Sequence, residues 1–455
     1  MPTVLWFRRD LRLTDHPALL AAARGQEPVV ALFVVDPRLV AAAGGPRLRR
    51  LAASLRALDE SLGGALVVRV GEPEVVVPAV AREAGATVVH VTASTEPYGR
   101  RRDAAVETSL DVPLVRTGSP YAVAPGRLRT QQGTPYTVFT PFRRAWERHG
   151  WSAPAAPAGA VTWERLSGDG WAALPRPDDG GVPGDDEAGE RAAGTAWDRF
   201  VDGALRDYAT DRDRPDRPGT SRLSAALKLG EVHPRTLLGR LEQAVAADPE
   251  LAAAAEVFIG QLAWREFHAD VLWHRPEAAH RSLRAVVHDE AWARGADADA
   301  AFAAWAAGRT GYPLVDAGMR QLAATGWMHN RVRMVTASFL VKDLHLDWRR
   351  GAAHFMAHLV DGDVAQNQLN WQWVAGTGFD AAPYFRVLNP VTQSQRFDPD
   401  GAYVHRWVPE LRDVPAPAVH QPWTLGERAP GDYPAPMVDH ATERRATLEA
   451  YGRGR

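Results

Sequence analysis

The chain has 455 residues, of which 45% are hydrophobic and 24% are charged, and its formal net charge is −2. This length predicts two or three domains at roughly 100–200 residues each, and the charge excludes a nucleic-acid-binding protein that is basic over its whole surface. The absence of Cys excludes disulfides, a thiolate nucleophile and cysteine-bound metals. No apolar run reaches the roughly 18 residues of a membrane span and no signal peptide is evident, so a cytoplasmic protein is expected.

The first 130 residues alternate short apolar runs with amphipathic stretches. The intervening stretches 47–62 and 72–85 follow a helical pattern. Strands that alternate with helices predict a Rossmann-like, doubly wound parallel sheet, so residues 1–130 are expected to form an α/β domain. The runs that read as buried strands are 4–7, 29–35, 65–70, 87–91 and 112–115.

The rest of the chain changes character twice. Residues 131–195 are expected to be an interdomain linker, because from about 151 the sequence turns to Ala, Pro, Gly and Asp. Beyond 196 the strand patterns vanish and helical periodicity returns, and residues 196–455 are predicted to form an all-α domain. This periodicity is clearest over 252–274, 315–326 and 333–360.

Several common sites are excluded. No G-x-G-x-x-G follows the first predicted strand, and neither lysine of the chain, Lys228 or Lys342, is preceded by Gly, so both usual phosphate-binding loops are absent. His354 and His358 have the i, i+4 spacing of metal ligands, but Phe355 stands where a zinc protease carries Glu. We therefore expect no metal.

Three segments of the second domain concentrate polar and aromatic side chains. "GTSRLS" (219–224) places hydroxyls and an Arg before a helical pattern, which suits a pyrophosphate or a simple N-cap. "WMHNRVRM" (327–334) carries two Arg, and a buried Arg requires an acidic partner such as Asp361. The stretch 362–386 crowds amides against two Trp. Amides can fix a polar heterocycle, while indoles can stack on bases or pass electrons.

These segments, together with "RTGYPLVDAGMRQLAATG", "SFLVKDLHLDWRRG" and "VLWFRRDLRLTDHPAL", resemble the photolyase/cryptochrome family, most closely the class I enzymes for cyclobutane pyrimidine dimers. The resemblance covers nearly the whole chain outside the linker. It implies a light-dependent DNA-repair lyase, with one FAD bound non-covalently in the helical domain and an antenna chromophore in the α/β domain.

The resemblance also implies cofactor contacts. Arg333 and Asp361 would pair over the flavin ring, Asp363 would lie near its polar edge, and Asn367 would hydrogen-bond at its N5. Charges and hydrogen bonds at these positions tune a flavin. The phosphates and ribitol would be contacted by Tyr208, Thr220, Ser221, Arg222, Leu223 and Ser224, with Arg265 near them.

UV-damaged DNA is the implied partner, and no obligate oligomer is expected. Trp264 and Trp373 would form the aromatic wall of the lesion cavity, on which a flipped base stacks. Residues 212–240 hold seven positive and three acidic side chains, a local basic patch. The other implied DNA-facing residues are Trp327, Arg212, Arg331 and Arg386.

Electron transfer and lesion choice rest on further matches. Trp371 and Trp348 match the inner and middle members of the tryptophan chain that reduces the flavin, with Trp292 or Trp305 as the outer member. Asn330 and Met334 stand where enzymes for (6-4) photoproducts carry His, which favours cyclobutane dimers. Gln261 does not fit this assignment, because class I enzymes for cyclobutane dimers usually carry Glu at this position.

Two alternatives stay open, a cryptochrome-type photoreceptor and a (6-4) photolyase. The antenna is also open: "LFVVDP" (32–37) and "EPYGRRRDAAV" (96–106) look like photolyases that bind 8-hydroxydeazaflavin, with folate as the alternative.

Overall fold

The computed structural model of the protein describes residues 1–176, 188–284, 292–380 and 386–453. The chain forms two compact units, each assembled from segments that are distant in the sequence. Unit 1 comprises Met1–Arg206, Ser221–Pro276 and Val360–Ala365, and unit 2 comprises Asp207–Thr220, Glu277–Leu359 and Gln366–Arg455. None of the described helices combines the length and the apolar character that a membrane span requires.

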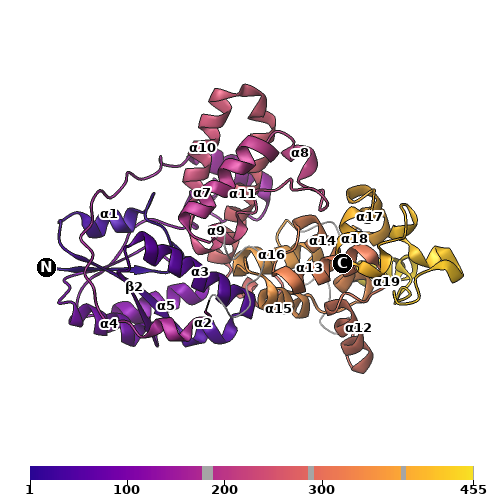
Figure 1. The fold of residues 1–455 in the computed structure, drawn as a ribbon, viewed down its shortest axis with the longest axis horizontal. Coiled ribbons are helices and arrows are strands. Elements are labelled where there is room, and N and C mark those ends of the chain that lie inside the picture. Colours follow the sequence, from indigo (N-terminus) through magenta and orange to yellow (C-terminus); the bar gives the residue numbers. More distant parts are fainter. Residues whose placement is uncertain (177–187, 285–291, 381–385, 454–455) are drawn as a thin grey trace. The chain divides into compact units, whose positions relative to one another are not determined.

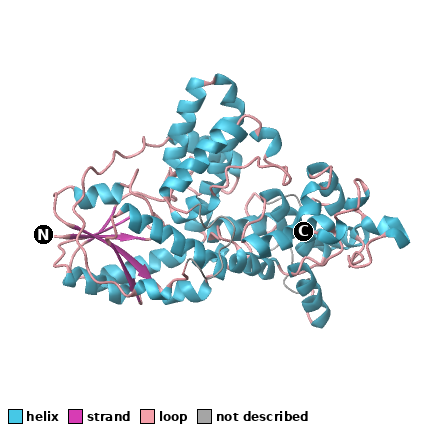
Figure 2. Ribbon diagram, viewed as in Figure 1, coloured by secondary structure: helices cyan, strands magenta, loops and turns pink. Residues whose placement is uncertain are grey.

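Unit 1 contains a five-stranded parallel sheet with the strand order β3-β2-β1-β4-β5. Each strand lies within two residues of a predicted run, which confirms the α/β fold. Figure 2 shows the strands gathered in this one sheet. They are β1 (Thr3–Phe7), β2 (Val29–Val35), β3 (Leu66–Val70), β4 (Val89–Val91) and β5 (Leu114–Arg116).

Helices cover both faces of the sheet (Figure 1). Successive side chains of a strand point to opposite faces, so apolar side chains on each face pack against a layer of helices. Leu5 and Phe7 pack toward α1 (Pro17–Ala23) and α3 (Gly45–Ser61). Val4 and Trp6 pack on the opposite face toward α4 (Pro73–Glu83) and α5 (Pro97–Ser109). The continuous apolar runs of the strands are thus explained by burial on both sides.

Unit 1 also contains a helical part, and one of its helices lies in the stretch predicted as linker. This helix, α6, buries Phe142 and Trp146. Glu266 of α11 accepts a hydrogen bond from Trp146 Nε1 at 2.6 Å, and burial raises the pKa of this carboxyl to about 7. Residues 177–187 of the linker lie outside the described residues. The helices are α2 (Pro37–Ala42), α6 (Phe139–His149), α7 (Glu190–Arg199), α9 (Ser224–Leu229), α10 (Pro234–Ala247) and α11 (Ala252–His274).

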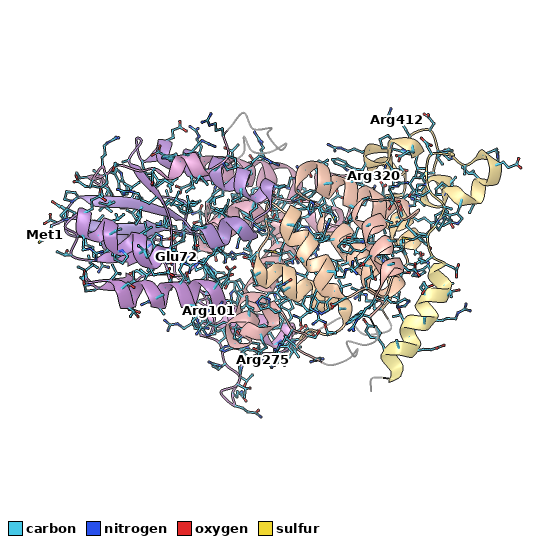
Figure 3. The ribbon with its side chains drawn as sticks, turned by 90° about the horizontal axis from the view of Figure 1, so that it is seen from below. Met1, Glu72, Arg101, Arg275, Arg320 and Arg412 are labelled. Atoms are coloured by element: carbon cyan, nitrogen blue, oxygen red, sulfur yellow. The ribbon has the colours of Figure 1, made fainter. Side chains whose placement is uncertain are left out.

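All regular secondary structure among the described residues of unit 2 is helical, as predicted. Its core contains Trp305, Phe339 and Trp348, each fully buried. At its surface Arg320, labelled in Figure 3, forms an ion pair with Glu410 at 2.7 Å. The helices are α8 (Tyr208–Asp211), α12 (Ala296–Ala306), α13 (Pro313–Thr325), α14 (Asn330–Ser338), α15 (Trp348–His358), α16 (Val364–Ala375), α17 (Pro390–Phe397), α18 (Ala402–Trp407) and α19 (His440–Arg453), with α16 entering unit 2 at Gln366.

The helical pattern predicted over 333–360 is interrupted in the structure. After α14 the chain forms one π-helical turn, η7 (Phe339–Asp343), and the helical segment then ends. His345 adopts a left-handed backbone conformation with φ 51°. Asp347 then caps α15 by accepting a hydrogen bond from Arg349 N at 2.9 Å. A capping carboxylate therefore starts a second helix that the apolar pattern could not separate from the first.

Candidate active site

Helix α16 carries the amides noted in the sequence, and two of them bind backbone groups of unit 2. Gln372 accepts a hydrogen bond from Leu283 N at 3.0 Å and donates one to Ala278 O at 2.9 Å. One turn earlier, Gln368 donates to Ala279 O at 2.8 Å. These amides anchor the segment that follows the end of α11, so their first role is structural.

Asn367, the residue expected at flavin N5, is buried with 8% of its surface exposed. Its amide nitrogen donates to Ala352 O at 3.0 Å and to Gln368 Oε1 at 3.1 Å. Both N–H groups are thereby used, and the side chain can offer a ligand only its carbonyl oxygen.

Trp371 of α16 packs against α15 and keeps 2% of its surface exposed. Its ring packs on the backbone of Gly351, where a Cβ atom would lie 2.2 Å from Cη2. It contacts Phe355 edge-on, with ring centroids 5.0 Å apart, and Trp305 edge-on at 6.3 Å. Trp371 is therefore held rigidly, as an electron relay requires.

The other members expected in the tryptophan chain are also buried. Trp348 begins α15, is fully buried, and donates from Nε1 to Ser282 Oγ at 3.1 Å. Trp292 keeps 6% of its surface exposed, whereas Trp305 keeps none and donates to Thr336 O. An outer member must exchange electrons with solvent, so this difference in exposure favours Trp292.

Trp373, expected in the lesion wall, lies under the guanidinium of Arg386, whose Cζ is 6.0 Å from the indole centroid. Lys342 donates to the backbone carbonyl of Arg386 at 2.8 Å and orders the chain there. Burial lowers the pKa of Lys342 to about 8. An exposed Arg thus stands next to a half-buried Trp, as expected for a surface that receives DNA.

Arg331 and Arg212, expected to face DNA, lie near one carboxylate. Arg331 forms an ion pair with Asp213 at 2.8 Å and covers the ring of Phe397 at 4.5 Å. Arg212 lies 4.0 Å from Asp213. Trp327, the third residue expected to face DNA here, is half-buried.

The four residues of helix α14 that were singled out from the sequence differ in their exposure to solvent. Asn330 begins the helix and is exposed, whereas Arg331, Arg333 and Met334 are half-buried. Arg333 donates from Nε to Met328 O at 2.8 Å. Arg333 belongs to unit 2 and Asp361 to unit 1, so the predicted ion pair of these two residues stays a prediction.

The segment before α9 offers hydrogen-bond donors. Leu223 is the N-cap residue of this helix, and its apolar side chain accepts no hydrogen bond from the first-turn N–H groups, which have no partner within the helix. Arg222 adopts a left-handed backbone with φ 54°, a conformation that is uncommon for non-glycine residues and is enriched at functional sites. Leu223 is buried, Ser221 is half-buried and Ser224 is exposed. In unit 2, Thr220 is half-buried and Tyr208 is buried.

Helix α11 presents Gln261, Trp264 and Arg265 on half-buried surface. Trp264 stacks on Phe139 of α6, with ring centroids 3.7 Å apart and planes 10° from parallel. Arg265 donates to Leu227 O at 3.1 Å and covers the ring of Tyr121. Phe139 therefore fixes the plane of the indole that was predicted to meet the lesion.

Asp363 is the centre of a buried ionic cluster in unit 1. Its carboxylate binds Arg9 at 2.5 Å and lies 3.8 Å from Lys228. Both cations also bind Glu96. Asp361, two residues earlier, keeps 8% of its surface exposed. The acidic pair expected near the flavin thus includes one carboxylate that is already neutralised by basic groups.

The two antenna motifs meet in unit 1. Asp36 follows β2 and accepts hydrogen bonds from Tyr98 Oη and from Arg38. Glu96 directly precedes α5, which follows β4. Both motifs therefore lie at the carboxyl ends of parallel strands, where α/β folds commonly bind ligands.

Comparisons with known proteins agree over the full chain. Residues 3–160 match the family described as "DNA photolyase", and residues 258–453 match "FAD binding domain of DNA photolyase". The "Deoxyribodipyrimidine photo-lyase" of Streptomyces griseus is 45% identical over 98% of both chains. That of Escherichia coli is 40% identical over 98% of both.

The chain belongs to the photolyase/cryptochrome family.

Solved structures of this family share the fold. A class III photolyase from Agrobacterium tumefaciens superimposes with a TM-score of 0.88 at 36% identity, covering 100% of this chain and 97% of that one. A Synechocystis cryptochrome gives a TM-score of 0.88 at 28% identity, covering 99% of both chains. The backbone is therefore common to repair enzymes and a cryptochrome, and the side chains must decide between their functions.

The match of residues 258–453 to the FAD binding domain of DNA photolyase confirms the prediction that the chain has an FAD-binding domain. The donor set present also fits this cofactor. The hydroxyls of Ser221 and Ser224 at the start of α9 suit its phosphates, and Asn367 offers an acceptor that a reduced flavin, with its N5–H, can use.

Sequence reasoning missed three residues that shape this photolyase-family site. Gly351 admits the ring of Trp371, Phe139 stacks on Trp264, and Arg9 binds Asp363. Gly351 follows Trp348 by three residues, so its place on the same helix could be inferred from the sequence. The other two contacts join segments more than 100 residues apart, and no local pattern predicts them.

Proposed function

We propose that the protein is a class I deoxyribodipyrimidine photo-lyase that splits cyclobutane pyrimidine dimers in UV-damaged DNA under light. The predicted enzyme, a deoxyribodipyrimidine photo-lyase, and its light-dependent DNA repair are confirmed by full-length relatives at 40–45% identity that carry this name. This full-length identity is the observation that carries the proposal. A class III photolyase is also similar, so the assignment to class I rests on the motifs.

Reduced FAD, when bound and excited by light, supplies the electron that opens the cyclobutane ring and receives it back. The protein's own part is to hold this cofactor without a covalent bond. Ser221, Arg222, Leu223 and Ser224, with Tyr208, Thr220 and Arg265, would bind its phosphates and ribitol. Arg333, Asp361, Asp363 and Asn367 would set the charge and hydrogen bonding around its ring.

DNA is bound through a local basic surface, and the dimer must leave the duplex to be reached. Stacking on an indole returns roughly 1–3 kcal/mol per base, which offsets a large part of the cost of extrusion. Trp264 and Trp373 are the stacking platforms in this proposal, supported by the stacking of Trp264 on Phe139, by Arg386 next to Trp373, and by the partial exposure of both Trp residues. Trp327, Arg212, Arg331 and Arg386 would contact the backbone around them.

Lesion choice follows from the chemistry of the cavity. A (6-4) photoproduct requires proton transfer, and neither Asn330 nor Met334 can act as an acid or base near neutral pH. Splitting a cyclobutane ring requires no such acid. Gln261 departs from the Glu usual in class I, but its amide can still donate to a pyrimidine carbonyl.

The remaining assignments extend this proposal. Trp371, Trp348 and Trp292 carry electrons to a resting oxidised flavin. Residues 1–130 bind an antenna, 8-hydroxydeazaflavin in preference to folate, which the placement of Asp36 and Glu96 supports. Residues 131–195 link this domain to the catalytic residues 196–455, and the protein works in the cytoplasm as a monomer.

The deciding experiment is repair of a defined oligonucleotide. Purified protein with chemically reduced flavin is illuminated with near-UV or blue light together with DNA that contains either one cyclobutane dimer or one (6-4) photoproduct. We expect restoration of the cyclobutane substrate alone. Restoration of the (6-4) substrate alone would make Gln261 the informative residue, and restoration of neither would favour a photoreceptor, whose fold is shared.

A further inference from the structure

A chain of side-chain amides links the backbone of unit 2 to Asn367. Gln368 donates from Nε2 to Ala279 O at 2.8 Å, and its Oε1 accepts from Asn367 Nδ2 at 3.1 Å. Asn367 donates its other N–H to Ala352 O at 3.0 Å. All of these residues belong to unit 2.

The direction of this chain is fixed by chemistry. A backbone carbonyl can only accept a hydrogen bond, so Ala279 O requires the nitrogen of Gln368 and Ala352 O requires the nitrogen of Asn367. With its nitrogen at Ala279, Gln368 must turn its oxygen toward Asn367. That oxygen occupies the second N–H of Asn367, which would otherwise be able to donate to a ligand.

We propose that Gln368 is a positioning residue that makes Asn367 a pure hydrogen-bond acceptor, and thereby makes the site prefer reduced over oxidised flavin. The inference rests on the proposed function, in which Asn367 meets flavin N5. Reduced flavin carries a hydrogen on N5 and can donate to Asn367 Oδ1, whereas oxidised flavin has only a lone pair there and needs a donor. Ala352 orients the amide, and Gln368 removes its remaining donor.

Gln372 provides a matched control for this role. It lies one turn further along α16, is fully buried and anchors the same segment through Ala278 and Leu283. The structure records no hydrogen bond from Gln372 to Asn367 among the described residues. Gln368→Met and Gln372→Met each replace an amide with a thioether of nearly equal length, so both weaken the fold, but only the first frees an N–H of Asn367.

The first measurement uses flavin-free protein. The chain contains four Asn, at positions 330, 367, 370 and 389, so selective ¹⁵N-Asn labelling yields four side-chain amide signals. Both protons of Asn367 should exchange slowly with solvent in the wild type and in Gln372→Met. One of them should exchange rapidly in Gln368→Met. Slow exchange of both protons in Gln368→Met would overturn the proposed relay.

The second measurement is the midpoint potential of the bound flavin. Loss of one hydrogen bond should lower the preference of Gln368→Met for reduced flavin roughly tenfold, which for a two-electron couple corresponds to about 30 mV toward lower potential. Gln372→Met should keep the wild-type potential. An unchanged potential in Gln368→Met, or an equal shift in Gln372→Met, would overturn the proposal.

A third variant keeps the test open if Gln368→Met does not fold. In Gln368→Glu the neutral carboxyl can donate to Ala279 O and accept from Asn367, whereas the ionised form cannot donate. Its potential should match the wild type at low pH and fall below it as the carboxyl ionises. A constant difference from the wild type at all pH values would contradict the relay. The wild-type protein tests the proposed function separately. If it binds FAD and repairs dimers, a negative result with the variants contradicts the relay alone and leaves the proposed function intact.

Discussion

The ring of Trp371 rests directly on the backbone of Gly351: a Cβ atom there would lie 2.2 Å from Cη2 and 2.5 Å from Cζ3 of the indole. The distance excludes any side chain at this position unless the indole moves. The absence of a side chain at Gly351 therefore sets where the ring of Trp371 lies.

Gly351→Ala should displace Trp371 and slow the light-driven reduction of bound FAD. The extra methyl group overpacks the core and should reduce the free energy of unfolding by about 1–3 kcal/mol. Gly194→Ala on α7 is the control, since nothing lies within 4 Å of a Cβ at Gly194; it should stabilise by up to about 1 kcal/mol. Photoreduction monitored by flavin absorbance, with urea unfolding, tests both, and wild-type behaviour of Gly351→Ala would contradict the packing argument.

Trp371→Phe should block photoreduction of oxidised FAD while leaving chemically reduced enzyme able to repair DNA. In the proposed function the tryptophan chain serves only the resting flavin, whereas repair requires electron transfer between flavin and lesion. Trp292→Phe should slow net photoreduction more than Trp305→Phe, because Trp292 keeps 6% exposure and Trp305 none. A larger loss with Trp305→Phe would instead place this residue in the chain through its edge contact with Trp371.

DNA affinity should fall steeply with salt, because each phosphate that the protein neutralises releases counterions. The logarithm of the binding constant should fall with the logarithm of the salt concentration, with a slope of roughly −0.9 per phosphate neutralised. Arg331→Ala should lower this slope by about 1. Arg116→Ala is the control, since Arg116 lies on β5 and pairs with Glu107 at 2.8 Å. Titrations at several salt concentrations with dimer-containing DNA give the slopes, and equal slopes for Arg331→Ala and wild type would remove this residue from the DNA surface.

Asp398 should make stability depend on pH. Its carboxylate is fully buried and accepts hydrogen bonds from Tyr403 N and Val404 N, and burial raises its pKa from 3.8 to about 6. Since the folded state holds the proton more tightly, this group's contribution is fully present below pH 3.8 and is lost as pH rises to about 6.

Asp398→Asn removes the titrating group, so its stability relative to the wild type should rise by about 1–3 kcal/mol between low pH and pH above 6. Tyr403 N and Val404 N donate to different oxygens of Asp398, and Asn keeps only one acceptor oxygen, so one hydrogen bond to the start of α18 is lost and the variant should be the less stable protein at low pH. Urea unfolding at a series of pH values measures the difference. A difference that stays the same at all pH values would contradict the raised pKa of Asp398.

Much of the molecule follows from local sequence alone. Strands such as Val29–Val35 are continuous apolar runs because both faces of a parallel sheet are covered, and their bounds could be predicted closely. The FAD binding domain and the repair function could be predicted because the motifs around Ser221, Asn330 and Asn367 are long and ordered along the chain. These features depend on residue type and spacing within one segment.

Only the tertiary structure decided how distant segments use these side chains. Of the amides of α16, Asn367 was predicted to meet the flavin, and the sequence did not show that Gln368 and Gln372 hold the backbone of a segment about 90 residues away. Likewise the plane of Trp264 depends on Phe139, and the charge on Asp363 is balanced by Arg9. A hydrogen bond or a ring contact depends on positions in space to within a few tenths of an ångström. Such positions arise only after every helix has packed, so no pattern within a single segment can contain them.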